Sequence, residues 1–192
     1  MIGIHEITLG ILAGGRATRL GGCDKAWLER DGMPQVLRMS QRFAAEVSGV
    51  LVSANRLDAR YPSHGLTVVA DRIQDVGPLG GLDALGAACT TPWLLTVPVD
   101  LVGVNECLVP TLLASAGDSG AFAQDDDGRQ PLVALWRIEK LRDAVLQAMK
   151  AGEYATQALQ ARMEMTCVRF TGVRFGNLNT PADLVAAGIA TP

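Results

Sequence analysis

The chain has 192 residues, of which 48% are hydrophobic and 19% are charged, so it has enough apolar material for one domain with a sizeable core. Its formal net charge of −3 excludes the strongly basic footprint of proteins that bind nucleic acid or anionic membranes. We therefore expect that any phosphate it binds is held by a local cluster of cations.

Four cysteines are spread along the chain without a CxxC pair, which argues against a zinc site and against a disulfide framework. No basic segment precedes the first apolar stretch, which His5 and Glu6 interrupt, so we expect no signal peptide. No apolar run reaches the roughly 18–20 residues that a membrane span requires. These features predict a cytoplasmic protein.

Apolar runs of strand length alternate with amphipathic stretches of helical period. This alternation predicts parallel pairing in a layered α/β domain. The run Asp125–Gly128 is typical of a solvated turn between two strands. The expected strands are 6–12, 49–54, 66–70, 93–98, 119–123, 131–136 and 165–170, and the expected helices are 34–47, 79–89, 106–115, 138–150 and 181–187.

A glycine-rich, basic loop follows the first expected strand. The strand ends at Gly14 and Gly15, and the loop then carries Arg16, Arg19 and Lys25. Glycine lets backbone N–H groups approach phosphate oxygens, while the cations offset the charge of the phosphates. Glycines alone would indicate an ordinary turn, but three cations so close to one strand end favour a polyphosphate.

The spacing of this loop excludes two common phosphate-binding motifs. A P-loop ends in Gly-Lys-Ser/Thr, whereas Lys25 stands between Asp24 and Ala26. A dinucleotide loop reads GxGxxG, which the pairs Gly14-Gly15 and Gly21-Gly22 do not supply. The loop is therefore neither that of an ATPase nor an obvious NAD-binding loop.

Two acidic residues follow other expected strands. Asp71 comes after 66–70 and Asp100 comes after 93–98, and open parallel sheets bind ligands beyond the carboxyl ends of their strands. Asp100 fits either a turn or helix cap, or a ligand for Mg²⁺, an ion that takes few protein groups. Asp71 fits either a loop residue or a contact to a sugar hydroxyl, a base or a metal shell. Their convergence with the glycine loop favours a binding site.

Two further motifs allow both a structural and a functional interpretation. The run Gly77-Pro78-Leu79-Gly80-Gly81 fits a helix start, and its glycines would also let a flat base lie against the backbone. Asn177 and Asn179 alternate on an extended segment, so both can point toward one ligand. Thr180 followed by Pro181 predicts an N-cap and a first helical turn.

Taken together, these motifs resemble those of the molybdenum cofactor guanylyltransferases over nearly the full length of the chain. The resemblance implies a three-layer, Rossmann-like nucleotidyltransferase fold with a mostly parallel central sheet. It also implies a single domain of residues 1–192, with GTP bound by the N-terminal half and molybdopterin by the C-terminal half. The motifs are Leu12-Ala13-Gly14-Gly15, Arg19-Leu20-Gly21-Gly22, Asp24-Lys25, Ser53-Ala54-Asn55-Arg56, Asp71, Gly77-Pro78-Leu79-Gly80-Gly81, Pro98-Val99-Asp100 and Asn177-Leu178-Asn179-Thr180-Pro181.

The resemblance implies a magnesium-dependent enzyme that transfers GMP from GTP to the phosphate of molybdopterin and releases pyrophosphate. By this analogy Lys25, Asp100 and Arg19 carry the catalysis, with Lys25 at the triphosphate and Asp100 as the Mg²⁺ ligand. Leu12, Ala13 and Gly14 would line the guanine site, Asn55 and Asp71 would contact the nucleoside, and Asn177 and Asn179 would face the pterin. The complete implied binding set is Leu12, Ala13, Gly14, Gly15, Gly22, Lys25, Asn55, Asp71, Gly77, Asp100, Asn177 and Asn179.

Some positions leave alternatives open. Ser53 stands where the family often has Asn, so only Asn55 carries over from that motif. Gly14 leaves room for a purine, whereas the cytidylyltransferases of the same pathway tend to have Leu-Ala-Ala-Gly at this motif. A cytidylyltransferase is the first alternative function. A sugar-phosphate nucleotidyltransferase and a non-catalytic nucleotide-binding module are the others. Arg72, Arg129 and Gln130 are pterin candidates by position alone.

The expected partners are GTP and molybdopterin or the molybdenum cofactor, together with transient contacts to cofactor-insertion proteins or target molybdoenzymes.

Overall fold

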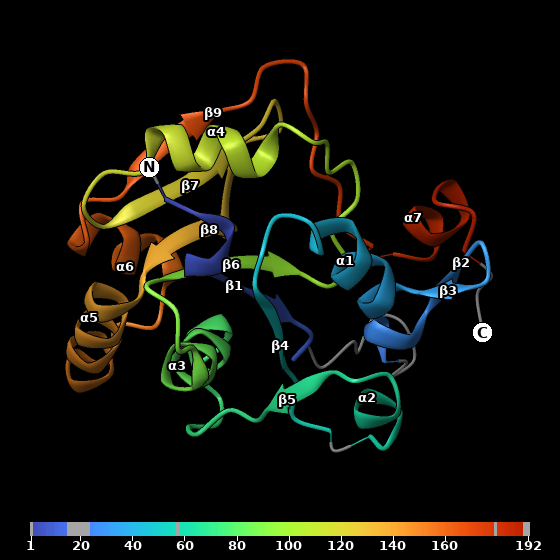
Figure 1. The fold of residues 1–192 in the computed structure, drawn as a ribbon, viewed down its shortest axis with the longest axis horizontal. Helices are drawn as coiled ribbons and strands as arrows, with labels where there is room; N and C mark the ends of the chain where they lie inside the picture. Colours follow the sequence, from blue (N-terminus) through green and yellow to red (C-terminus); the bar gives the residue numbers. More distant parts are fainter. Residues whose placement is uncertain (1, 15–23, 57, 179, 190–192) are drawn as a thin grey trace.

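The structure is a computed structural model that describes residues 2–14, 24–56, 58–178 and 180–189. Its centre is a seven-stranded sheet with the strand order β5-β4-β1-β6-β8-β7-β9 (Figure 1). The strands are β1 (Ile7–Leu12), β4 (Gly49–Ser53), β5 (Thr67–Val69), β6 (Trp93–Pro98), β7 (Gly120–Gln124), β8 (Arg129–Arg137) and β9 (Thr166–Arg169).

Most of the sheet is parallel, as the alternating sequence pattern predicted. The pairs β4–β5, β1–β4, β1–β6 and β7–β9 are parallel, whereas β8 runs antiparallel to both β6 and β7. The four-residue turn Asp125–Gly128 joins β7 directly to β8, and a connection this short permits only an antiparallel hairpin. Strand β8 is therefore the antiparallel exception in a mostly parallel sheet.

Helices cover both faces of the sheet, which gives the three layers (Figure 1). On one face, α1 (Gln35–Phe43) and α4 (Leu108–Ser115) contribute to the larger core cluster, which also takes in Tyr61 of the short helix α2 (Arg60–Ser63). On the other face, α3 (Pro78–Ala88), α5 (Ile138–Ala151) and α6 (Thr156–Arg162) pack around a second cluster that includes Trp136.

The expected helices agree with the structure except near their ends. The first was expected to reach residue 47 but ends at Phe43, and the one expected at 106 begins at Leu108. Helix α6 was not expected, because Leu159 is its only large aliphatic side chain and a seven-residue segment shows no clear period. Within the described ranges, every helix is too short or too polar to cross a bilayer.

A small satellite unit packs beside the sheet. The hairpin of β2 (Glu29–Arg30) and β3 (Met33–Pro34) lies next to α7 (Pro181–Ala186), as Figure 1 shows. An isolated bridge joins Arg30 to Ile189, and Leu28, Leu178, Leu184 and Ile189 form a third apolar cluster. Thr180 caps α7 by accepting a hydrogen bond from the Asp183 amide at 3.2 Å, which confirms the predicted N-cap.

The turn Asp125–Gly128 exposes Asp126 and Asp127, as expected of a solvated turn, but the carboxylate of Asp125 is buried. It accepts hydrogen bonds from the Phe175 amide at 2.7 Å, the Gly128 amide at 2.9 Å and the Gln130 side chain at 3.1 Å. Burial alone raises the pKa of Asp125, but these hydrogen bonds lower it, and the net pKa lies below the ordinary value. The turn therefore anchors the chain segment that contains Phe175.

Candidate active site

The carboxyl ends of three neighbouring parallel strands lie side by side. Leu12, the last residue of β1, pairs with Ser53 at the end of β4 and with Pro98 at the end of β6. Strand β1 is the switch point of the sheet, since the chain adds β4 on one side of it and β6 on the other. Ligands of open α/β sheets bind in the crevice at such a point.

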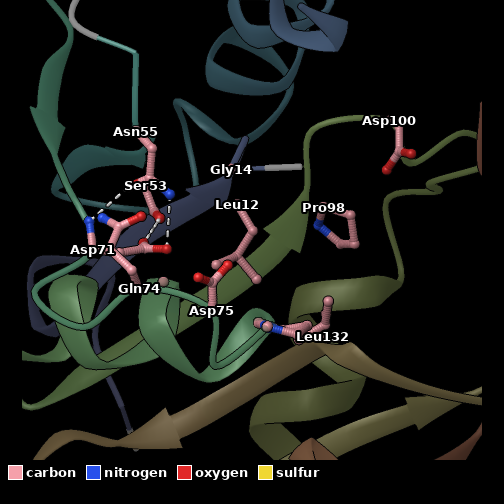
Figure 2. A pocket seen from close by; sticks show the side chains of 13 residues that line it. Leu12, Gly14, Ser53, Asn55, Asp71, Gln74, Asp75, Pro98, Asp100 and Leu132 are labelled. Atoms are coloured by element: carbon pink, nitrogen blue, oxygen red, sulfur yellow. Dashed lines mark hydrogen bonds between the residues drawn. The ribbon is translucent and has the colours of Figure 1, made fainter. Parts of the chain in front are cut away.

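A cavity of about 510 Å³ opens at these strand ends, which is large enough for a nucleotide-sized ligand. In Figure 2, Leu12 and Gly14 lie between a polar group on one side and Asp100 on the other. The cavity is lined by Leu12, Gly14, Ser53, Asn55, Asp71, Gln74, Asp75, Gly77, Pro78, Gly81, Pro98, Asp100 and Leu132.

The polar group on one side is a hydrogen-bonded set of three side chains. Asn55 donates from Nδ2 to Oδ2 of Asp71 at 2.9 Å, and its Oδ1 accepts from the Asp71 backbone N–H at 2.9 Å. Ser53 Oγ lies 3.4 Å from Asp71 Oδ1 and completes the set (Figure 2). The two reciprocal bonds fix the Asn55 and Asp71 side chains relative to one another at the ends of β4 and β5.

An ion pair lies on the opposite side. Lys25 Nζ donates to Asp100 Oδ2 at 2.6 Å, and the two side chains are only 17% and 14% exposed. Lys25 opens the 3₁₀ turn η3 (Lys25–Trp27), which Asp24 caps by accepting from the Ala26 amide at 3.0 Å. The Asp24-Lys25 motif thus supplies both the charged side chain and the cap that positions it.

The start of α3 forms a further part of the cavity wall. Gly77, its N-cap, has φ +61°, a conformation that favours glycine. A Cβ on Gly80 would lie 3.0 Å from Asp71 Oδ2, and one on Gly81 would lie 2.8 Å from Leu12 Cδ2 and from Ser53 Oγ. Glycine at these two positions therefore lets α3 pack directly against the site.

The structure brings together most of the predicted site residues that it describes. Leu12, Gly14, Asn55, Asp71, Gly77 and Asp100 line the cavity, and Lys25 joins them through its ion pair. Ala13 instead packs against the larger core cluster. The predicted residues Gly15, Arg19, Gly22 and Asn179 lie outside the described residues.

Asn177 lies near the site without being among the residues that line the cavity. It forms an isolated antiparallel bridge with Leu101, and the neighbouring Leu178 amide donates to the carbonyl of Asp100 at 3.2 Å. The C-terminal segment therefore supports the backbone at Asp100. The turn at Asp125 in turn holds this segment through Phe175.

Three lining residues belong to no predicted motif: Gln74, Asp75 and Leu132. Gln74 and Asp75 stand between Asp71 and Gly77, so their closeness to two predicted contacts was a usable signal. Leu132 belongs to the antiparallel strand β8, and nothing in its local sequence points to a ligand.

Two of the positional pterin candidates are engaged elsewhere. Arg72 makes two hydrogen bonds to Asp83 of α3, which raise the pKa of its guanidinium, and it lines a separate hollow between α3 and α5. Gln130 is bound to Asp125 in the β7–β8 turn. Neither is among the residues that line the cavity at the strand ends.

The site contains groups that bind and neutralise charge. The described lining residues include no histidine or cysteine, and within the described ranges no group of three or more His, Cys, Asp or Glu is arranged to hold a metal ion. Carboxylates and amide groups that line a nucleotide-sized cavity, with a lysine paired to one of them, suit a reaction in which the substrate supplies its own nucleophile.

Comparisons with known proteins identify the family of the chain. A family model described as the MobA-like NTP transferase domain matches residues 9–166. A molybdenum cofactor guanylyltransferase from Cupriavidus necator is 34% identical over 194 residues, which cover 96% of this chain and 97% of that protein.

Two solved structures show the same fold. Molybdopterin-guanine dinucleotide biosynthesis protein A from Archaeoglobus fulgidus superposes with a TM-score of 0.70 at 18% identity, over 94% of this chain and 96% of that one. The 2-C-methyl-D-erythritol 4-phosphate cytidylyltransferase from Thermus thermophilus gives a TM-score of 0.69 at 16% identity, over 93% and 96% of the two chains.

Proposed function

Because the chain belongs to the MobA-like NTP transferase family, we propose that it transfers GMP from GTP to the phosphate of molybdopterin, with or without bound molybdenum. A phosphate oxygen of molybdopterin attacks the α-phosphorus of GTP. A new P–O bond forms there, the bond to the β-phosphate oxygen breaks, and pyrophosphate leaves with the electron pair of that bond. The product is molybdopterin guanine dinucleotide.

The observation that carries this proposal is the division of the cavity into two chemically different sides. The Lys25–Asp100 pair lies on one side and the Asn55–Asp71 pair on the other, with the end of β1 between them. A nucleoside triphosphate has the same division, since its phosphates need cations and its nucleoside needs hydrogen-bonding partners. We assign Lys25 to the triphosphate and Asn55 with Asp71 to the nucleoside.

The described lining residues include no histidine, and the proposed acceptor needs no general base. A phosphate monoester is already anionic near neutral pH, so its oxygen needs no deprotonation before attack. The difficulty is repulsion between two anions, about 4 kcal/mol at 4 Å for an effective dielectric constant of 20. Unrelieved, this repulsion would slow the reaction roughly a thousandfold, and Lys25 is placed to reduce it.

The residues present also fit a magnesium ion. Mg²⁺ keeps several waters and binds one or two carboxylates together with substrate phosphates, and Asp100 offers one such carboxylate at the strand end. When bound, the ion would supply positive charge to the triphosphate. Asp100 would hold it, and Lys25 would then be released from its ion pair to contact phosphate oxygens.

We propose that the acceptor approaches from the C-terminal half of the chain. Leu132 of β8 brings this half to the cavity, and the segment with Asn177 runs beside the backbone of Asp100. Both features lie on the Asp100 side, where the α-phosphate of the nucleotide would be placed.

The direct test is release of pyrophosphate by the purified protein with molybdopterin present. Initial rates would be compared for GTP and CTP, with each nucleotide also incubated without molybdopterin. We expect release that needs molybdopterin and is faster with GTP by about tenfold or more. Equal use of the two nucleotides would favour the cytidylyltransferase alternative. GTP binding without any release would instead identify a non-catalytic nucleotide-binding module.

A further inference from the structure

The loop between β5 and α3 contributes a second carboxylate to the cavity, that of Asp75. Figure 2 shows Asp75 between the Asp71 group and Leu132, with its carboxylate directed toward the middle of the cavity. Its φ of +63° is unusual for a residue other than glycine, although Asp and Asn adopt such values more readily than most. The carboxylate of Asp75 thus faces the cavity, and the proposed reaction gives this carboxylate no role.

The charge of Asp75 restricts which part of a nucleotide it can meet. A carboxylate repels phosphate oxygens, whereas Lys25 on the opposite side attracts them. Asp75 follows Asp71 by four residues and precedes Gly77 by two, so it lies on the wall that takes the nucleoside. The base or the sugar is therefore its partner.

Hydrogen-bond chemistry separates the bases. Guanine presents two adjacent donors, N1–H and the N2 amino group, and an ionised carboxylate has two acceptor oxygens to match them. Cytosine and adenine each present one amino donor next to a ring nitrogen that is an acceptor. That nitrogen would face the carboxylate lone pairs without a proton between them, which costs binding energy.

The geometry points to Asp75 as the residue that selects guanine, by accepting hydrogen bonds from N1–H and the N2 amino group. This inference rests on the proposed function and deepens it. Gly14 leaves space for either purine, whereas a carboxylate distinguishes guanine from adenine as well as from cytosine. A site built to pair a donor rejects the analogue that lacks it more strongly than a site that excludes by size.

The test compares nucleotides that differ only at the base edge. Inosine triphosphate keeps N1–H, the ribose and the triphosphate of GTP but lacks the N2 amino group. Binding of GTP, inosine triphosphate and CTP to the full-length protein would be measured by isothermal titration calorimetry at one Mg²⁺ concentration. For the wild type we expect GTP to bind about tenfold or more tightly than inosine triphosphate.

The variant Asp75→Asn keeps the shape of the side chain and tolerates the positive φ. It should weaken GTP binding about tenfold or more, weaken inosine triphosphate less, and leave CTP nearly unchanged. The matched control is Asp31→Asn, since Asp31 also has a positive φ and its side chain is 75% exposed outside the cavity. All three nucleotides should bind this control as they bind the wild type.

A second variant, Asp75→Gly, removes the carboxylate and also suits the backbone, so a folding defect in one variant does not decide the question. Equal losses for GTP and inosine triphosphate would place Asp75 at the sugar or in a structural role and overturn the inference. Unchanged GTP binding would also overturn it. If the wild type showed no preference for GTP, the proposed base specificity itself would be wrong. The nucleotide preference of the wild type is therefore measured before any variant is made.

Discussion

At the scale of single residues, the Lys25–Asp100 pair controls the charge of the site. We predict that Asp100→Asn lowers kcat about 100-fold or more, because the amide carries no charge to hold a metal ion at the reacting phosphates. Lys25→Gln should raise KM for GTP and lower kcat less than Asp100→Asn does, because it removes a cation that contacts the triphosphate and offsets the repulsion between the two substrates. Steady-state rates of pyrophosphate release would separate the two effects.

The control for this prediction is the double variant. Each single variant breaks the ion pair and keeps the other partly buried charge, whereas the double variant removes both charges. Denaturant unfolding should therefore show less loss of stability in the double variant than the sum of the two singles. Full activity of Asp100→Asn would contradict the role assigned to Asp100.

Gly14 permits a prediction in which stability and binding respond differently. A Cβ added at Gly14 would meet nothing closer than 3.8 Å, the distance to the amide of Asn55 and to Ser53, so Gly14→Ala should not change the free energy of unfolding. The methyl group would nevertheless enter the cavity that Gly14 lines. We expect KM for GTP to rise several-fold and the preference for GTP over CTP to narrow.

Kinetics with both nucleotides and a denaturation curve would check the Gly14 prediction. Gly81→Ala is the contrasting variant, because its Cβ would lie 2.8 Å from atoms of Leu12 and Ser53 and should lower stability. Gly49→Ala is the neutral control, since its Cβ would meet no atom within 4 Å. Unchanged nucleotide preference in Gly14→Ala would remove Gly14 from the base site.

Sequence patterns located the site through residues that directly follow apolar strands. Asp71 and Asp100 were found in this way, because parallel strands bring their carboxyl ends to one edge. Leu132 could not be found, since it enters the cavity from an antiparallel strand whose pairing depends on the turn before it. The buried state of Asp125 was also missed, because the amide that binds it belongs to Phe175, fifty residues later.

At the scale of secondary-structure elements, alternating strands and helices predicted all seven strands of the main sheet within two residues at either end. The mostly parallel sheet is confirmed, but the pattern assigned no direction to β8, which the four-residue turn before it makes antiparallel. The β2–β3 hairpin was also missed, because its strands of two residues carry no pattern. Short elements depend on tertiary contacts, such as the bridge between Arg30 and Ile189.

The β7–β8 turn is the element whose buried charge should affect stability. Asp125→Ala would leave the Phe175 amide, now bound at 2.7 Å, without its acceptor, and we expect a loss of about 1–3 kcal/mol in the free energy of unfolding. Asp127→Ala is the matched control in the same turn. Asp127 is 56% exposed and pairs with Arg174 at 3.7 Å, so its loss should cost less than 1 kcal/mol.

The pH dependence gives this prediction a second readout. The pKa of Asp125 lies below its ordinary value in the folded protein, so its ionised form stabilises the fold above the unfolded pKa of about 3.9. That stabilisation is lost as the pH falls through the folded pKa. The stability difference between wild type and Asp125→Ala should therefore be constant near neutral pH and shrink below about pH 4. A difference that does not depend on pH would contradict it.

At the scale of the whole molecule, the cavity connects parts of the sheet that are far apart in the sequence. Its lining comes from the ends of β1, β4 and β6, from the start of α3 and from β8, so residues 12 to 132 contribute to one site. Structures with only 16–18% identity to this chain keep the same overall fold. The fold thus depends on the apolar pattern of these elements, while the nature of the ligand depends on a few side chains at their ends.

A ligand bound across this cavity should stabilise the entire fold, because unfolding would separate all the elements that hold it. At a concentration one hundred times Kd, GTP with Mg²⁺ should add about 2.7 kcal/mol to the free energy of unfolding. For a chain of this length, that corresponds to a rise in Tm of about 5–10 °C. At the same concentration CTP should give a smaller rise in Tm, and removal of Mg²⁺ with EDTA should abolish most of the rise with GTP.

Thermal unfolding of Lys25→Gln supplies the control, since without this cation GTP should raise Tm far less at the same concentration. Equal rises with GTP and CTP would contradict the proposed base preference, and a rise that does not depend on Lys25 would show that the nucleotide does not bind across the strand ends as proposed.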